Sequence, residues 1–309
     1  MNTSTLLARR KFLRTAALAA LAPAGCTSLQ GAHRGFIDAH VHVWTPDTRR
    51  YPISSDPAFQ KHRTVESFTP EELFAHSRPQ GVSRVVLIQM SFYKFDNSYM
   101  LDTIARHRGV FRGVAIVDET KPGLRATMKS LAARGVRGFR VYASKAQAAA
   151  WDESMWDMWH FAAEEGLSIC LLADPDALPA IHKMCARFPK TRVVVDHFAR
   201  IGMKGPVQQH DLDQLCRLAD FPHTHVKTSA FYALGAKKAP YTDMAPLIRK
   251  LRDTFGASRL MWASDCPFQV QEGHTYANSI ALIRDRLSFL SADDREWMLR
   301  KTAENVFFS

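Results

Sequence analysis

Three short segments of this chain carry side chains that can do metal or acid–base chemistry. His40 and His42 lie within the apolar run 36–44, while His197 and Asp265 each follow another apolar run. Because successive side chains of a strand alternate between its two faces, His40 and His42 are predicted to point the same way and to bring two imidazoles together. Imidazole and carboxylate groups gathered in this manner are typical of a centre that binds a metal ion or transfers protons.

Each of these residues also has an ordinary structural interpretation. Two histidines at alternate positions can lie on the solvent-facing side of a strand. Asp265 can cap the turn that follows it, and His197 can be a core imidazole whose partner is Asp196. A functional site is favoured because the residues recur at the same kind of place, directly after apolar, strand-like runs.

The first residues are predicted to be an export signal and not part of the fold. Arg9 and Arg10 form a twin-arginine pair that precedes a short apolar segment and several small residues, which is the pattern of an exported leader. Two processing routes remain open, cleavage after Ala24 and lipidation of Cys26. The apolar segment is shorter than the about 20 residues that span a bilayer. Residues 1–32 are therefore assigned to a twin-arginine signal peptide and leader of a periplasmic protein, soluble or lipid-anchored, with no transmembrane span.

The chain is basic, with a formal net charge of +11 over 309 residues. The leader contributes four of the cations and no acid, which leaves about +7 for the rest. The sequence contains no run of Lys and Arg and no interleaved basic and aromatic motif, which argues against a nucleic-acid partner. A basic domain without such motifs is predicted to attract a small anionic substrate.

The rest of the chain alternates between strand-like and helix-like segments. Segments such as 155–165, 177–188 and 244–255 carry apolar residues at helical spacing. Strands that alternate with helices of this length indicate βαβ units and a parallel sheet. The strand-like segments are eight apolar runs, at 36–44, 84–90, 111–118, 136–142, 167–173, 191–197, 225–229 and 259–264. Eight such units within residues 33–309 predict a single (β/α)₈ TIM-barrel domain.

Several polar side chains near the ends of these runs are candidates for contact with the substrate. Residues at the carboxyl ends of barrel strands face the active site, which favours Arg140 and Lys227 as inward-facing cations, with Tyr142 beside them. Arg200 suits the same role because a guanidinium binds a carboxylate in a bidentate fork. The alternative is that these cations are structural and pair with carboxylates of the barrel. The connection 45–81 is longer than an ordinary loop and is predicted to be a lid over the site.

Four ordered motifs together resemble the amidohydrolase superfamily, and the resemblance covers nearly all of the predicted domain. The motifs are Asp38-Ala39-His40-Val41-His42, Val195-Asp196-His197-Phe198, Val226-Lys227-Thr228-Ser229 and Met261-Trp262-Ala263-Ser264-Asp265-Cys266-Pro267. The branch that this chain resembles contains 2-pyrone-4,6-dicarboxylate lactonase, sugar lactonases and 4-sulfomuconolactone hydrolase. The resemblance implies a TIM-barrel hydrolase that opens a small, carboxylated lactone by water attack on the ester carbonyl.

Lactone hydrolysis needs a base for the water, a polarised carbonyl and anchors for the charge of the substrate. Asp265 is the predicted general base, and His197 is predicted to hydrogen-bond the carbonyl or to serve as a further metal ligand. His40, His42 and Asp265 can hold one zinc ion, since three protein ligands and an open position are usual for catalytic zinc. In a metal-independent alternative, His40 and His42 polarise the carbonyl directly.

The main alternative function is a metal-dependent decarboxylase of the same superfamily that acts on an aromatic or unsaturated carboxylate. The resemblance implies that such an enzyme ordinarily carries more metal-ligating histidines. The run that ends at Leu172-Ala173 has no histidine where many metal-rich members place one. This departure argues against the decarboxylase and against a binuclear metal site.

Overall fold

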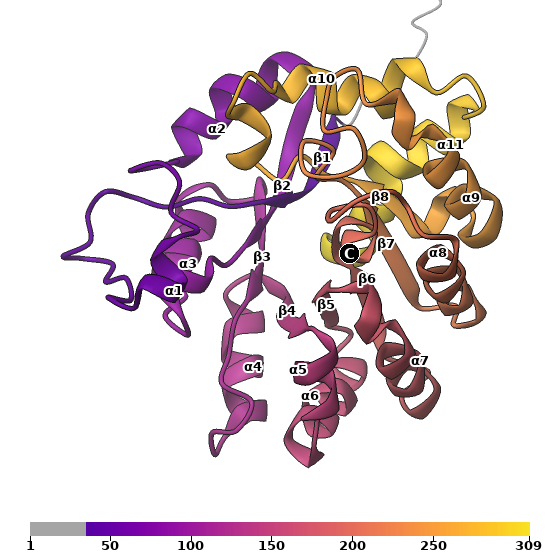
Figure 1. Ribbon diagram of the computed structural model, residues 1–309. Coiled ribbons are helices and arrows are strands. Elements are labelled where there is room, and N and C mark those ends of the chain that lie inside the picture. Colours follow the sequence, from indigo (N-terminus) through magenta and orange to yellow (C-terminus); the bar gives the residue numbers. More distant parts are fainter. Residues whose placement is uncertain (1–34) are drawn as a thin grey trace, which may run out of the picture. The chain divides into compact units, whose positions relative to one another are not determined.

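The computed structural model describes residues 35–309, and the predicted leader, with Arg9, Arg10, Ala24 and Cys26, lies outside the described residues. Eight parallel strands pair with one another in chain order around a single, nearly closed sheet, as Figure 1 shows. They are β1 (Phe36–Val41), β2 (Val82–Ile88), β3 (Phe111–Ala115), β4 (Val136–Ala143), β5 (Ser168–Ala173), β6 (Arg192–Val195), β7 (Thr224–Thr228) and β8 (Leu260–Trp262). The predicted (β/α)₈ barrel is therefore confirmed.

The barrel closes through the segment that follows the short strand β8. Val41 and Cys266 form a parallel bridge. The Asp265 amide donates to the His40 carbonyl at 2.9 Å, and the amide of His42 donates to the Cys266 carbonyl at 2.8 Å. This seam ties the carboxyl end of β1 to the segment after β8. Backbone hydrogen bonds thus hold the two histidines beside Asp265, independently of any contact between their side chains.

Helices connect successive strands and cover the outside of the sheet (Figure 1). They are α1 (Pro57–Gln60), α2 (Pro70–Ser77), α3 (Ser98–Arg106), α4 (Leu124–Ala133), α5 (Lys145–Ala149), α6 (Glu153–Glu164), α7 (Leu178–Arg187), α8 (Gln209–Cys216), α9 (Ala245–Phe255), α10 (Tyr276–Ala281), α11 (Ala292–Glu296) and α12 (Thr302–Phe307). In α9, Leu247, Leu251 and Phe255 are buried at helical spacing, so one face of this helix packs on the barrel. The helices expected from apolar spacing are confirmed as α6, α7 and α9. Within residues 35–309, none of the helices is long and apolar enough to cross a membrane.

The long connection between β1 and β2 contains two helices, α1 and α2. Trp44 and Phe68 form an antiparallel bridge with backbone hydrogen bonds of 2.9 and 3.0 Å. This bridge fastens the connection to the start of the barrel. The connection also supplies Phe59 and His62 to the walls of two cavities described below. Its movement as a lid stays a prediction.

Candidate active site

His40, His42 and Asp265 bring three potential ligand atoms into one triangle. The Nε2 atoms of His40 and His42 lie 3.2 Å apart. Asp265 Oδ1 lies 3.2 Å from His42 Nε2 and 3.5 Å from His40 Nε2. Three ligands that each lie about 2.0–2.2 Å from a tetrahedral zinc ion are themselves separated by about 3.3–3.6 Å. The triangle therefore has the dimensions of a metal site.

The tautomers of the two imidazoles decide whether these nitrogen atoms can bind a metal ion. His42 Nδ1 lies 2.8 Å from the Ile88 carbonyl oxygen, so Nδ1 carries the proton and Nε2 presents a lone pair. His40 Nδ1 lies 3.4 Å from Asp196 Oδ1 and 3.3 Å from Lys227 Nζ; in the tautomer whose Nδ1 proton points at the carboxylate, His40 Nε2 also presents a lone pair. The buried Asp265 Oδ1 has no hydrogen-bond donor within the described residues. Two lone pairs and an unpartnered carboxylate oxygen converge, so these residues fit a metal ion.

A buried ion pair lies behind His40. Lys227 Nζ is 2.9 Å from Asp196 Oδ1 and 3.3 Å from His40 Nδ1, and the side chains of all three residues are 0% exposed. Burial by itself raises the pKa of Asp196, but the Lys227 ammonium and His40 lower the pKa of this carboxyl well below its usual range. Burial and the Lys227 charge lower the pKa of His40, which keeps its imidazole neutral and suited to bind a metal.

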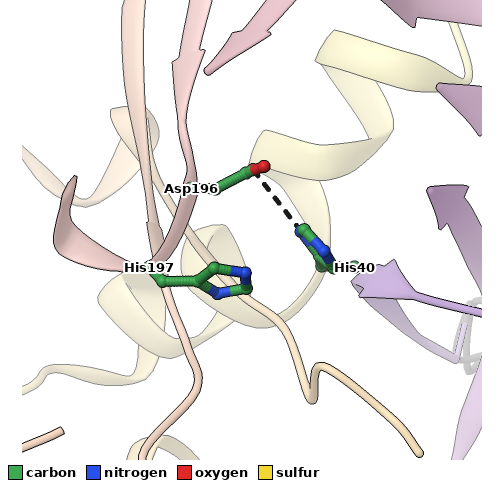
Figure 2. A group of neighbouring side chains, drawn as sticks. All are labelled: His40, Asp196 and His197. Atoms are coloured by element: carbon green, nitrogen blue, oxygen red, sulfur yellow. Dashed lines mark ion pairs between the residues drawn. The ribbon is translucent and has the colours of Figure 1, made fainter. Parts of the chain in front are cut away.

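A second set of possible metal ligands shares His40. His40, Asp196 and His197 also lie within ligand distance of one another, and Figure 2 shows Asp196 directed at His40 with the His197 ring beside them. Asp196, however, is already paired with the ammonium of Lys227 at 2.9 Å. The set of His40, His42 and Asp265 is the better candidate because, within residues 35–309, its carboxylate oxygen has no lysine or arginine partner.

An unusual backbone turn directs His197 toward the cavity. Residues His197 to Arg200 all have φ between 50° and 57°, a left-handed conformation that costs about 1–2 kcal/mol for each residue other than glycine. In this turn His197 Nδ1 lies 2.8 Å from Ser229 Oγ, and its Nε2 lies 3.7 Å from Asp265 Oδ2. Burial lowers the pKa of His197, so the imidazole is neutral. Local strain of this kind is commonly retained where it positions a functional group.

Asp265 is held in its ionised form at the floor of the cavity. Burial raises its pKa, but His197, His42 and His40 together lower the pKa below its usual range. Tyr232 donates a hydrogen bond from its hydroxyl to Asp265 Oδ2 at 2.7 Å, and burial keeps the pKa of Tyr232 well above its ordinary value. Tyr232 could not be predicted from the motifs, because it lies in a loop after β7 and belongs to none of them.

Most of the predicted site residues meet at one cavity of about 300 Å³. Its wall includes His42, Arg140, Tyr142, His197, Arg200 and Asp265. His40 lies behind this wall as part of the buried triangle. Leu172, near the end of β5, also lines the cavity, so an aliphatic side chain and not a metal ligand faces the cavity from this strand.

The three predicted cations have different surroundings. Arg140 is 8% exposed, its buried Nε has no partner, and no ion pair joins it to another described residue. Arg200 Nη2 is paired with Asp174 Oδ1 at 2.7 Å, and its Nε donates to a backbone carbonyl at 3.3 Å. Lys227 does not line the cavity but lies behind it, paired with Asp196. Arg140 therefore has the donors that are freest to bind a ligand, whereas Lys227 is placed as a structural cation and not as a substrate contact.

Comparison with known proteins places the chain in a family. The family model described as amidohydrolase matches residues 37–308. L-fucono-1,5-lactonase of Burkholderia ambifaria is 28% identical over 245 residues, which cover 77% of this chain and 82% of that protein. 4-Sulfomuconolactone hydrolase of Rhizobium radiobacter is 26% identical, with 76% of each chain covered.

The similarity extends to three dimensions. A crystal structure of an amidohydrolase from Burkholderia multivorans with bound zinc is 20% identical and has a TM-score of 0.74, with 88% of this chain and 99% of that chain covered. At this identity the comparison shows a shared fold. Because the family model spans nearly all of the described residues, the chain belongs to the amidohydrolase family of enzymes.

Proposed function

We propose that this enzyme hydrolyses the ester bond of a small lactone by attack of water on the ring carbonyl. The names of the two relatives, a lactonase and a lactone hydrolase, support this reaction. The observation that carries the proposal is the ionised Asp265 carboxylate at the cavity floor, with Oδ2 held by Tyr232 and Oδ1 facing the two histidines. A fixed carboxylate of this kind can remove a proton from water.

His40, His42 and Asp265 would hold one zinc ion. When bound, such an ion supplies a Lewis acid that polarises a carbonyl and makes water more acidic. Asp265 takes the proton of water as the new C–O bond forms at the carbonyl carbon. The ring C–O bond then breaks, and the leaving alkoxide takes up this proton. His197 Nδ1 is hydrogen-bonded to Ser229 Oγ; in the tautomer in which the Ser229 hydroxyl donates to Nδ1, His197 Nε2 carries the proton and can donate to the carbonyl oxygen.

Arg140 and Arg200, which we call the rim of the catalytic cavity, favour an anionic substrate. Arg140 lines the cavity, and its buried Nε has no partner within the described residues. Arg200, whose guanidinium is partly engaged by Asp174, lines the same cavity. A guanidinium binds a carboxylate through two parallel hydrogen bonds. A carboxylated lactone would therefore be anchored at Arg140, with its ester carbonyl directed toward His197 and Asp265.

The test combines metal analysis with a screen of lactones. The purified protein is expected to contain about one equivalent of zinc, to lose activity on chelation, and to release protons from a carboxymethyl-substituted five-membered lactone faster than from the matching carboxamide. Full activity in metal-free protein would contradict the zinc mechanism and leave His197 as the group that polarises the carbonyl. Release of carbon dioxide from an aromatic carboxylate, with no lactone opened, would instead establish the decarboxylase alternative.

We further propose that residues 1–32 direct export by the twin-arginine route. The support is the sequence pattern around Arg9 and Arg10, since such pairs are read as an address for export. The double variant Arg9→Lys, Arg10→Lys is expected to remain in the cytoplasm, as measured by cell fractionation. An unchanged periplasmic fraction would contradict the proposal. Mass spectrometry of the exported protein would distinguish acylation of Cys26 from cleavage after Ala24.

A further inference from the structure

A second cavity, of about 540 Å³, lies beside the catalytic cavity. We call it the side chamber. Its wall is mainly apolar and includes Phe59, Phe95, Ile116, Trp151, Met155 and Met158. These residues come from α1, α6 and the segments after β2, β3 and β4 (Figure 1). The chamber therefore opens at the carboxyl ends of the strands, the same end of the barrel as the catalytic residues.

The side chamber and the catalytic cavity share part of their walls. Ser91, Arg140 and Tyr142 line both. Arg140 stands at this shared wall with a buried Nε that lacks a partner. A ligand whose anionic group binds Arg140 can therefore reach Asp265 on one side and the apolar wall on the other.

The lining residues indicate what the chamber accepts. Apart from Arg140, its charged lining residues are Lys94 and Glu119. Their charges are opposite, so these two residues do not form a second binding site for an anion. Phe95 is 52% exposed. A lone exposed phenylalanine is ordinary on a protein surface, but this one lines a concave apolar wall that an apolar ligand group would cover.

We propose that the side chamber binds an aryl or alkyl substituent of the carboxylated lactone that this enzyme opens. This inference rests on the proposed lactone hydrolysis and narrows its substrate class to lactones with an apolar group next to the carboxylate. Burial of that group against Trp151, Met155 and Phe95 removes apolar surface from water and so strengthens binding.

A kinetic comparison tests this substrate class. The probes are two carboxymethyl-substituted five-membered lactones that differ only by a hydrogen or a phenyl substituent on the ring. For the native enzyme, kcat/KM is expected to be on the order of 10- to 100-fold higher for the phenyl lactone. Equal values for the two lactones would overturn the inference.

Matched variants locate the preference in the chamber. Ala150 is exposed and lines the side chamber, so Ala150→Phe fills the space with little cost to the fold and is expected to abolish the phenyl preference while leaving the phenyl-free lactone unaffected. Ala146 is also exposed and is not part of the chamber wall, so Ala146→Phe is the control and keeps the preference. A second variant, Phe95→Ala, is expected to reduce the preference severalfold. Equal losses for both lactones in Ala150→Phe would contradict the assignment.

A binding experiment separates this inference from the proposed reaction. The probes are 4-phenylbutanoate and butanoate, which the enzyme cannot hydrolyse, titrated by calorimetry into the native protein and into the Ala150→Phe and Ala146→Phe variants. Tighter binding of 4-phenylbutanoate that Ala150→Phe alone removes supports the chamber even if no lactone is opened. Lactone hydrolysis with equal binding of the two acids would overturn the chamber while the reaction stands.

Discussion

The floor and the rim of the catalytic cavity use their charges in opposite ways. Asp265 forms the floor, and behind it the His40, Asp196 and Lys227 side chains are 0% exposed, and each contacts the next. At the rim, the buried Nε of Arg140 has no partner in the part of the chain that the structure describes, and Arg200 shares a half-buried pair with Asp174. Charges that are satisfied within the protein fix geometry, whereas open donors recognise a ligand. Floor substitutions should therefore affect every substrate, and rim substitutions only the charged ones.

The largest expected effect follows from the Asp265→Asn variant, which keeps the shape of the side chain and removes its basicity. We expect kcat to fall on the order of 10²–10⁴-fold, the usual contribution of general acid–base catalysis, for charged and neutral lactones alike. Circular dichroism should show the native fold. If the variant retained most of its turnover, Asp265 would be a structural cap and His197 would become the candidate base.

The buried ion pair of Asp196 and Lys227, behind the floor, is expected to contribute to the free energy of unfolding. Lys227→Met leaves the Asp196 carboxylate buried without its cation, which should lower the free energy of unfolding by about 3–5 kcal/mol and weaken zinc binding by about 10–100-fold. Urea unfolding and metal titration measure the two effects. Adding Asp196→Asn should recover part of the stability. The exposed Lys204→Met serves as the control, with an expected change within about 0.5 kcal/mol; an equally small change in Lys227→Met would contradict this account of the floor.

Substitutions at the rim are expected to lower activity on charged lactones and not on neutral ones. Arg140→Met should weaken the transition-state binding of a carboxymethyl lactone by about 2–5 kcal/mol and leave its carboxamide analogue nearly unchanged. Arg200→Met should have a smaller effect because part of its guanidinium is already bonded to Asp174. Steady-state kinetics on the two lactones measures both variants. Equal losses for both substrates would mean that Arg140 only supports the barrel.

The smallest effect is expected for substitution of Tyr232, which contacts the Asp265 carboxylate at the cavity floor. Its hydroxyl donates to Asp265 Oδ2 at 2.7 Å and so favours the ionised carboxylate. A hydrogen bond to a charged group contributes about 1.5–3 kcal/mol. Tyr232→Phe should lower kcat about tenfold. Because loss of this donor raises the pKa of Asp265, the acid limb of the kcat/KM profile should move to higher pH. An unmoved acid limb would mean that Tyr232 acts only through packing.

Much of the fold could be predicted from the sequence, because each strand of a buried parallel sheet is a short apolar run and eight such runs alternate with helical spacing. Strand ends were less predictable. The run 259–264 became the three-residue strand β8, since β-ladder pairing ends at Trp262 and the residues beyond it turn to close the barrel. His40, His42, His197 and Asp265 could be found because local motifs carry them.

Long-range pairings and loop geometry could not be predicted in this way. The pair of Asp196 and Lys227 joins the end of β6 to β7, and the sequence alone does not show which carboxylate a buried lysine will meet. The left-handed turn after Asp196 contains no glycine, so local propensity argues against it. Tyr232 gave no signal beyond its position after a strand. The donors of Arg140 could be recognised as unpaired only after its surroundings were known.

One measurement tests the division between floor and rim most directly. The ratio of kcat/KM for the carboxymethyl lactone to that for its carboxamide is determined in the native enzyme, in Asp265→Asn, in Arg140→Met and in the double variant. The account predicts that Asp265→Asn leaves the ratio unchanged, that Arg140→Met lowers it, and that the two effects multiply in the double variant, as expected for independent sites. A ratio that falls in Asp265→Asn, or that survives in Arg140→Met, would contradict the separation of catalysis at the floor from charge recognition at the rim.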